Sequence, residues 1–159
     1  MIQWYPGHMH KASKEFRKIL PQVDLVIEVL DARLPGSSEN PMLAQLRRAK
    51  PCIKLINKSD LSDPVRLAPW IASLESQTLV KTLACSINDN AIGGLPALCR
   101  SLVPRRDNRS TMIHAMIAGI PNVGKSTLIN RLANRKIAKT GNEAALTRMQ
   151  QRIEISPEL

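Results

Sequence analysis

Continuous apolar runs along the chain alternate with segments in which apolar residues recur at helical spacing. Such runs are typical of strands buried on both faces, and the spacing between them is typical of amphipathic helices. The predicted strands cover 23–30, 52–56, 78–85 and 112–118. The predicted helices cover 10–20, 41–49, 64–74, 94–102 and 127–134. This alternation predicts an α/β protein whose parallel sheet carries helices on both faces, a three-layer arrangement.

A glycine-rich loop follows the apolar run at 112–118. Residues 119–126 read GIPNVGKS and fit the phosphate-binding pattern G-x-x-x-x-G-K-[ST] at every constrained position. The glycines let backbone N–H groups close around phosphate oxygens, and the helix that follows adds partial positive charge. Lys125 would reach the β- and γ-phosphates, and the Ser126 hydroxyl would ligate Mg²⁺. The candidate nucleotide-binding residues of this segment are Asn122, Val123, Gly124, Lys125, Ser126 and Thr127.

A second motif follows the apolar run at 52–56 and consists of Asn57, Lys58, Ser59 and Asp60. The sequence N-K-x-D after a buried strand is how a phosphate-loop protein can read guanine. The Asp60 carboxylate can accept hydrogen bonds from the ring N1–H and from the exocyclic amine. Adenine offers neither donor on that edge, so the motif disfavours an ATP-dependent enzyme. Asn57 would contact the base and brace neighbouring loops, and the Lys58 stem would lie along the ring.

Other predicted loops lie at the same edge, because ligands of open α/β sheets bind beyond the carboxyl ends of the strands. A polar loop at 31–36 follows the first strand. Ser86 and Ile87 follow the strand at 78–85, where a small residue can bring its backbone N–H toward the guanine carbonyl. Thr147 could close on Mg²⁺ and the γ-phosphate, which makes it, with Lys125, a candidate catalytic residue.

The chain of 159 residues carries a formal net charge of +10, which favours a polyanionic partner, nucleic acid before membrane. Residues 1–22 form a basic N-terminal extension in which Lys11, Lys14 and Lys18 share a helical face. This face either contacts RNA phosphates or is simply solvated, and both interpretations stay open. Three cysteines without metal-ligand spacing indicate buried thiols in a reducing compartment. Since no apolar run reaches membrane-spanning length and the start is no signal peptide, we expect a cytoplasmic protein. We separately expect a monomer.

The two nucleotide motifs stand in an unusual order, because the base-reading motif at 57–60 precedes the phosphate loop at 119–126. An ordinary Ras-like GTPase has the reverse order. The folded site is indifferent to this order, since every loop still emerges from the same edge of the sheet. We therefore predict a circular permutation in which residues 104–111 join what are normally the two chain ends.

These motifs together resemble the YlqF-like group of circularly permuted GTPases, which act in ribosome assembly. The matching segments are 4–9 (WYPGHM), 31–35 (DARLP), 57–60, the phosphate loop with Pro121 and Asn122, and Gly141, Asn142, Thr147, Gln150 and Gln151. The resemblance implies that residues 1–159 form one permuted Ras-like GTPase domain that binds GTP or GDP with Mg²⁺. It also implies a role in late maturation of the large ribosomal subunit and contact with its precursor particle and rRNA.

The chain also departs from that family. Ala144 and Ala145 stand where the family usually has Pro-Gly, and Arg152 stands where it usually has an aromatic residue. The family's Asp-x-x-Gly strand and its C-terminal helical domain have no counterpart before residue 159. We therefore expect a sheet that is incomplete at the C-terminus, poorly docked or irregular structure over 142–159, and weakened or absent hydrolysis. Two functions stay open: a GTPase of ribosome assembly, and a hydrolysis-deficient module that binds guanine nucleotides and RNA.

Overall fold

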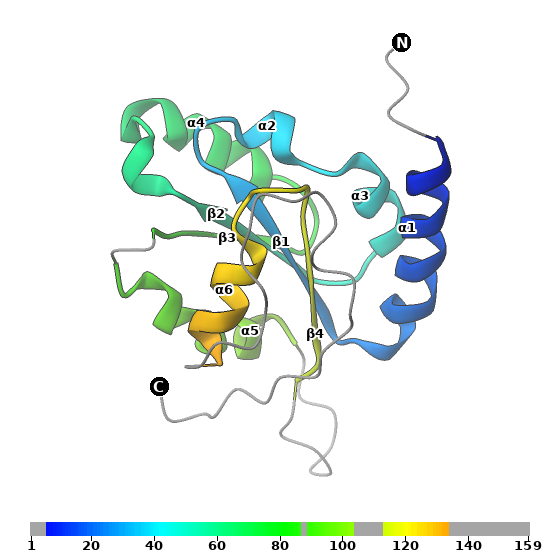
Figure 1. Cartoon of the computed structure of the whole chain (residues 1–159). Helices are drawn as coiled ribbons and strands as arrows, with labels where there is room; N and C mark the ends of the chain where they lie inside the picture. Colours follow the sequence, from blue (N-terminus) through cyan, green and yellow to red (C-terminus); the bar gives the residue numbers. More distant parts are fainter. Residues whose placement is uncertain (1–5, 87–88, 104–112, 134–159) are drawn as a thin grey trace.

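The computed structural model describes residues 6–86, 89–103 and 113–133, with only the backbone described at 6–10 and 12. Within these ranges, four strands form one parallel sheet in the order β3-β2-β1-β4 (Figure 1). The strands are β1 (Leu25–Asp31), β2 (Cys52–Asn57), β3 (Val80–Ala84) and β4 (Ala115–Ala118). The predicted α/β class and parallel sheet are confirmed, although the strand bounds differ by up to three residues.

Helices alternate with these strands as the periodicity predicts. The longer ones are α1 (Pro6–Ile19), α3 (Pro41–Arg47), α4 (Pro64–Glu75), α5 (Leu95–Leu102) and α6 (Lys125–Leu132). The shorter ones are α2 (Pro35–Ser38), η1 (Leu20–Gln22), η2 (Ser59–Leu61) and η3 (Ala91–Gly94). None of these short helices was predicted. No helix in the described part of the chain has the length and apolarity needed to cross a bilayer.

The short helix α2 depends on a contact that the sequence pattern does not reveal. The Ser38 hydroxyl accepts a hydrogen bond from the Asp31 backbone N–H at 3.0 Å and donates to the Leu34 carbonyl at 2.9 Å. These bonds satisfy a backbone group at the end of β1 and hold the following chain in one helical turn. The segment predicted as a polar loop is therefore partly helical.

Both faces of the sheet are covered, because successive side chains of a strand point in opposite directions. On one face, Leu25, Ile27 and Val29 of β1 share a core with Leu95 of α5 and Leu128 of α6. The opposite face has two clusters. Val26 packs with Leu20 and with Leu43 of α3, whereas Leu30 packs with Leu67 and Leu74 of α4. The predicted three-layer arrangement is confirmed.

A buried ion pair interrupts the apolar face of β1 and β2. Glu28 and Lys54 are register partners, and their side chains are 1% and 0% exposed. Lys54 Nζ lies 2.5 Å from Glu28 Oε2 and 2.7 Å from Glu39 Oε1. The other Glu28 oxygen accepts from the Asn40 backbone N–H, which stands at the start of α3. The pair therefore ties two central strands to the chain segment that enters α3.

The position of β4 explains how distant motifs meet. β4 pairs with β1 from Leu25↔Ala115 to Glu28↔Ala118, and β2 pairs with the other side of β1. Because all three strands run parallel, the loops after β2 and β4 leave the sheet at the same edge. The predicted linker at 104–111 and the region 142–159 lie outside the described residues.

Candidate functional site

The two predicted nucleotide motifs are in direct contact. Asn57 Nδ2 donates to the Val123 carbonyl at 2.9 Å, and Lys58 Nζ donates to the Asn122 carbonyl at 3.0 Å. Asn57 ends β2, whereas Asn122 and Val123 belong to the loop between β4 and α6. Side chains of the base-reading motif therefore hold the phosphate loop by its backbone, across more than 60 residues of sequence.

Two glycines of the phosphate loop have no room for a side chain. Gly124 has a φ of +100°, and a Cβ there would lie 2.3 Å from Asn57 Nδ2. Gly119 has a φ of +155°, and a Cβ there would lie 2.7 Å from the Val29 carbonyl oxygen. Both positions combine a backbone conformation that glycine favours with a close approach of neighbouring atoms. The glycines of the motif are thus required by the fold around the loop.

Lys125 is the first residue of α6 and turns back across the loop. Its Nζ donates to the Ile120 carbonyl at 2.6 Å. Burial lowers the pKa of Lys125, and no carboxylate among the described residues forms an ion pair with it. A cation without a carboxylate partner at the start of a helix is well placed to receive an anionic group.

Asp31 links β1 to the base-reading motif. Its Oδ2 accepts from Lys58 Nζ at 2.8 Å and from Arg33 Nη2 at 2.7 Å, and its Oδ1 accepts from Arg33 Nε at 2.9 Å. These hydrogen bonds, from Arg33 first and then from Lys58, hold the pKa of Asp31 below its usual range. Asp31 was assigned to a loop and given no role in our sequence interpretation. Parallel pairing of the two strands places Asp31 opposite Asn57, a register that the structure shows and the sequence pattern does not.

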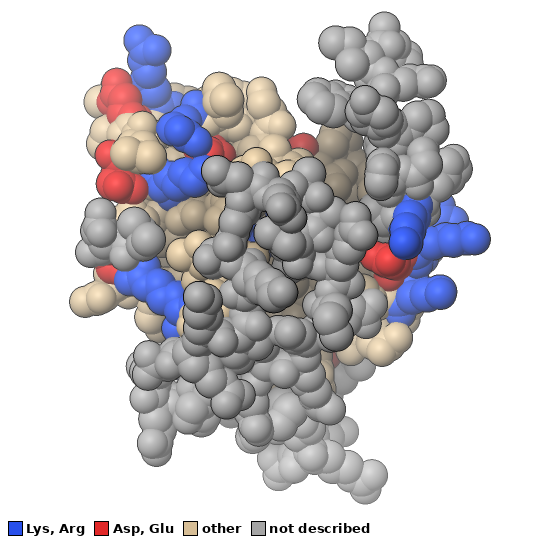
Figure 2. Space-filling view, in the orientation of Figure 1, with Lys and Arg blue, Asp and Glu red and all other residues tan. Residues whose placement is uncertain are grey.

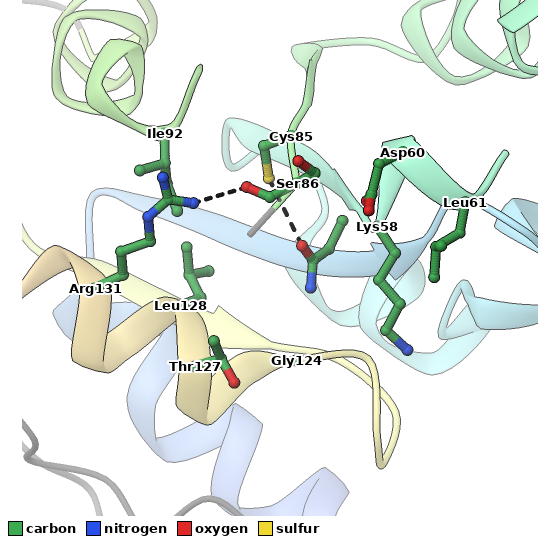
Figure 3. Close-up of a pocket in the computed structure, with 11 residues that line it drawn as sticks. Lys58, Asp60, Leu61, Cys85, Ser86, Ile92, Gly124, Thr127, Leu128 and Arg131 are labelled. Atoms are coloured by element: carbon green, nitrogen blue, oxygen red, sulfur yellow. Dashed lines mark hydrogen bonds between the residues drawn. The ribbon is translucent and has the colours of Figure 1, made fainter. Parts of the chain in front are cut away.

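A pocket of about 200 Å³ opens between the two motifs (Figure 3). It is lined by Asn57, Lys58, Asp60, Leu61, Cys85, Ser86, Ile92, Gly124, Thr127, Leu128 and Arg131. Asp60 lies in η2 and is exposed, so its carboxylate is accessible to a ligand. Apolar side chains, including Ile92 and Leu128, line other walls. A small pocket with apolar walls and a few polar groups is the usual form of a small-molecule site.

The Ser86 backbone N–H, which was predicted to approach the guanine carbonyl, has a hydrogen-bond partner within the protein. It donates to Asp89 Oδ2 at 2.7 Å, so this group is engaged within its own loop. The Ser86 carbonyl accepts from Arg131 Nη1, also at 2.7 Å. Ile87, the neighbouring candidate, lies outside the described residues. Arg131 and Asp89 were missed in the sequence interpretation, since nothing in their local sequence marks them.

The candidate metal ligands are only partly described. Ser126 follows Lys125 in the first turn of α6 and is half-buried, whereas Thr147 lies outside the described residues. In the parts of the chain that the structure describes, no group of three or more His, Cys, Asp or Glu could hold a metal ion. The Ser126 hydroxyl could supply one oxygen ligand to Mg²⁺. Phosphate and water oxygens would then occupy the remaining coordination positions.

Comparison with known protein families shows that the chain is similar to ribosome-associated GTPases. Residues 114–158 match the model of a family described as 50S ribosome-binding GTPase. Over 169 residues the chain is 42% identical to ribosome biogenesis GTPase A of Bacillus cereus, covering 100% of this chain and 56% of the relative. Over 160 residues it is 36% identical to mitochondrial ribosome-associated GTPase 1 of Mus musculus, covering 93% and 48%. The chain thus spans about half the length of these relatives.

Solved structures agree with this placement. The GNP-bound YlqF from T. maritima is 27% identical and superposes with a TM-score of 0.59, over 81% of this chain and 51% of that one. A GDP-bound YlqF is also 27% identical, with a TM-score of 0.57 over 76% and 48%. The sheet and its phosphate loop therefore have the P-loop GTPase fold.

Proposed function

Because the chain belongs to the YlqF-like family of GTPases, we propose that it binds GTP and GDP and acts in assembly of the large ribosomal subunit. Similar proteins support the first part, since the solved YlqF structures are bound to GDP and to GNP. The relatives named for ribosome biogenesis or the ribosome support the second part. The chain matches the bacterial relatives over 99–100% of its own length, so the similarity is not confined to one motif.

One observation carries the nucleotide proposal: both hydrogen bonds between the motifs join a side chain of the predicted base-reading motif to a backbone carbonyl of the predicted phosphate loop. Asn57 and Lys58 hold the backbone of the loop that ends at Lys125. Asp60 and Gly124 line the same pocket. A single molecule that extends from Asp60 to Lys125 would therefore present a donor-rich base at one end and an anion at the other. Guanosine di- and triphosphates have this form.

We propose that hydrolysis depends chiefly on neutralising the charge of the phosphates and on holding them in position. Lys125 and the backbone N–H groups around the phosphate loop would neutralise charge on the phosphates. Ser126 would hold Mg²⁺, which supplies further charge neutralisation at the β- and γ-phosphates when bound. Thr147 is proposed to join these groups. The hydrolysis-deficient alternative predicts nucleotide binding without phosphate release, and addition of large-subunit particles to a phosphate-release assay separates the two.

Contact with rRNA is proposed for the basic surface of α1. Lys11, Lys14, Arg17 and Lys18 are exposed on this helix. Figure 2 shows basic side chains gathered along the edge of the molecule where α1 lies. Such a surface favours phosphate backbones and makes binding salt-dependent. We propose that the protein works as a monomer in the cytoplasm, where its ribosomal partner is assembled.

The decisive experiment compares mant-GDP with mant-ADP in a fluorescence titration of the purified chain. We expect a preference for GDP on the order of 10⁴, because adenine would leave the Asp60 carboxylate without its donors. Asp60→Asn should move the preference toward xanthosine diphosphate, since an amide donates where the carboxylate accepted. Equal affinity of the wild-type protein for GDP and ADP would contradict the proposal.

A matched control stands three residues away. Asp63 caps α4 by accepting from the Val65 N–H at 2.9 Å, and asparagine is an equally good cap. Asp63→Asn makes the same chemical change outside the pocket and should leave the base preference unaltered. If both variants behave alike, Asp60 is not the residue that reads the base.

A further inference from the structure

We propose that Arg131 is a positioning residue for base recognition, because it ties the loop that begins at Ser86 to the phosphate-loop helix. This inference rests on the proposed nucleotide function and adds a determinant that neither sequence motif contains. Arg131 stands in the last turn of α6, six residues after the first residue of that helix. It lines the pocket on the side opposite Asp60 (Figure 3).

The contacts of Arg131 span the loop. Its Nη1 donates to the Ser86 carbonyl at 2.7 Å, and its Nη2 donates to the Asp89 carbonyl. The two acceptors stand three positions apart in the sequence, and one planar guanidinium binds both of them. Arginine presents its donors in a rigid fork, which suits two carbonyls held at a fixed separation.

Asp89 stabilises the same loop from within. Its Oδ2 accepts from the Ser86 N–H at 2.7 Å, and its Oδ1 accepts from the Ala91 N–H at 3.0 Å. These bonds tie Asp89 to Ser86 and Ala91, whereas the Arg131 bonds fix where Ser86 and Asp89 sit relative to α6. Because Thr127 and Leu128 of α6 also line the pocket, the distance across the pocket depends on this attachment.

The direction in which the Ser86 and Asp89 carbonyls point affects the choice between guanine and adenine. Guanine carries an acceptor, O6, where adenine carries a donor, the 6-amino group. A backbone carbonyl free to turn into the pocket would repel guanine O6 and accept from the adenine amine. Arg131 binds the carbonyls of Ser86 and Asp89, so they are directed toward the helix. Arg131 thereby favours guanine without touching the base.

The test measures affinities of Arg131→Ala for mant-GDP and mant-ADP alongside the wild-type chain. We expect GDP affinity to fall about tenfold, as for loss of charge-assisted hydrogen bonds, with a smaller fall or a gain for ADP. The GDP-to-ADP ratio should therefore decrease. Arg131→Lys should recover part of the ratio, because an ammonium can reach one carbonyl but cannot bridge two.

Arg100→Ala serves as the control, since Arg100 is an exposed arginine on α5 that does not line the pocket. It should leave both affinities unchanged. A merely structural role for Arg131 would lower both affinities equally and leave the ratio intact, which would overturn the inference. Failure of the wild-type chain to prefer GDP would instead count against the proposed function itself.

Discussion

At the scale of single residues, the candidate site depends on side chains that bind other parts of the protein as much as on those that face a ligand. Lys58 is the clearest case, because its ammonium contacts Asp31 on one side and the Asn122 carbonyl on the other. The lysine therefore joins β1 to the phosphate loop. These two contacts restrain its stem, and a side chain that the protein itself holds in place reduces the ordering cost of binding.

Asp31→Asn tests this arrangement. The amide keeps the shape of the side chain but loses the charge that holds Lys58 Nζ at 2.8 Å. We expect mant-GDP affinity to fall about tenfold, the typical cost of losing a charge-assisted hydrogen bond at a binding site. Arg33→Gln is the control, because the Arg33 side chain is 52% exposed and exposed ion pairs contribute little. Equal losses in both variants would show that Lys58 does not depend on Asp31.

The lowered pKa of Asp31 predicts that the stability of the fold depends on pH. The pKa of Asp31 is lower in the fold than the value of about 3.9 expected in an unfolded chain. Its stabilising contribution is therefore complete above that unfolded pKa and is lost as the pH falls toward the folded pKa. The difference in unfolding free energy between the wild-type chain and Asp31→Asn should be constant near neutral pH and should shrink below about pH 4. Urea titrations at several pH values measure it.

At the scale of secondary-structure elements, the pairing of β1 with β2 combines apolar burial with one ion pair. Glu28 and Lys54 lie opposite each other in the middle of the sheet. Burial alone would lower the pKa of Lys54, but Glu28 and Glu39 outweigh this and raise it. The lysine is therefore charged in the fold. A one-residue shift of the register would bury these charges apart, so the pair favours a single register.

Lys54→Met should destabilise the protein by about 3–5 kcal/mol, because it leaves the buried Glu28 carboxylate without its cation. Urea denaturation at neutral pH measures the change. Lys81→Met, on the neighbouring strand β3, makes the same substitution at an exposed position and should cost little. A Lys54→Met protein as stable as the Lys81→Met protein would show that the ion pair contributes nothing to the fold.

At the scale of the whole molecule, the order of the motifs along the chain matters less than the order of the strands in the sheet. β1 lies between β2 and β4, although β4 follows it by more than 80 residues. The loops after these three strands therefore share one edge. Both faces of the sheet must be covered for this arrangement to be stable, and the three apolar clusters meet that requirement.

Thiol reactivity reports on this double-sided core. Cys85 and Cys99 belong to one face, and Cys52 belongs to the other. Burial raises the pKa of each thiol to about 11 from an ordinary value of 9.0. At pH 8 the thiolate fraction should therefore fall about 100-fold, and alkylation should slow at least as much relative to the urea-unfolded chain. Rapid labelling of any cysteine in the native protein would mean that its face of the sheet is open.

Local pattern was sufficient for most elements and insufficient for their details. The strands and longer helices appear where apolar runs and helical periodicity predict them. Their ends shift because terminal residues respond to neighbours. Leu79 adopts a positive φ of 57° just before β3 begins, and α6 begins at Lys125 because Gly124 ends the loop. The short helix α2 needs the Ser38–Asp31 bond, which no local pattern contains.

The sequence by itself determined the two nucleotide motifs, the α/β class and the family resemblance, because each depends on residue types at fixed spacing within short segments. Tertiary structure alone decided that Asp31 holds Lys58, that Lys54 is buried with Glu28, and that Arg131 binds the loop at Ser86. These partners are separated by 26 to 45 residues, and their contacts arise only when strands pair and helices cover them. Spacing within a segment can be read along the chain, whereas a contact between segments is a property of the packed sheet.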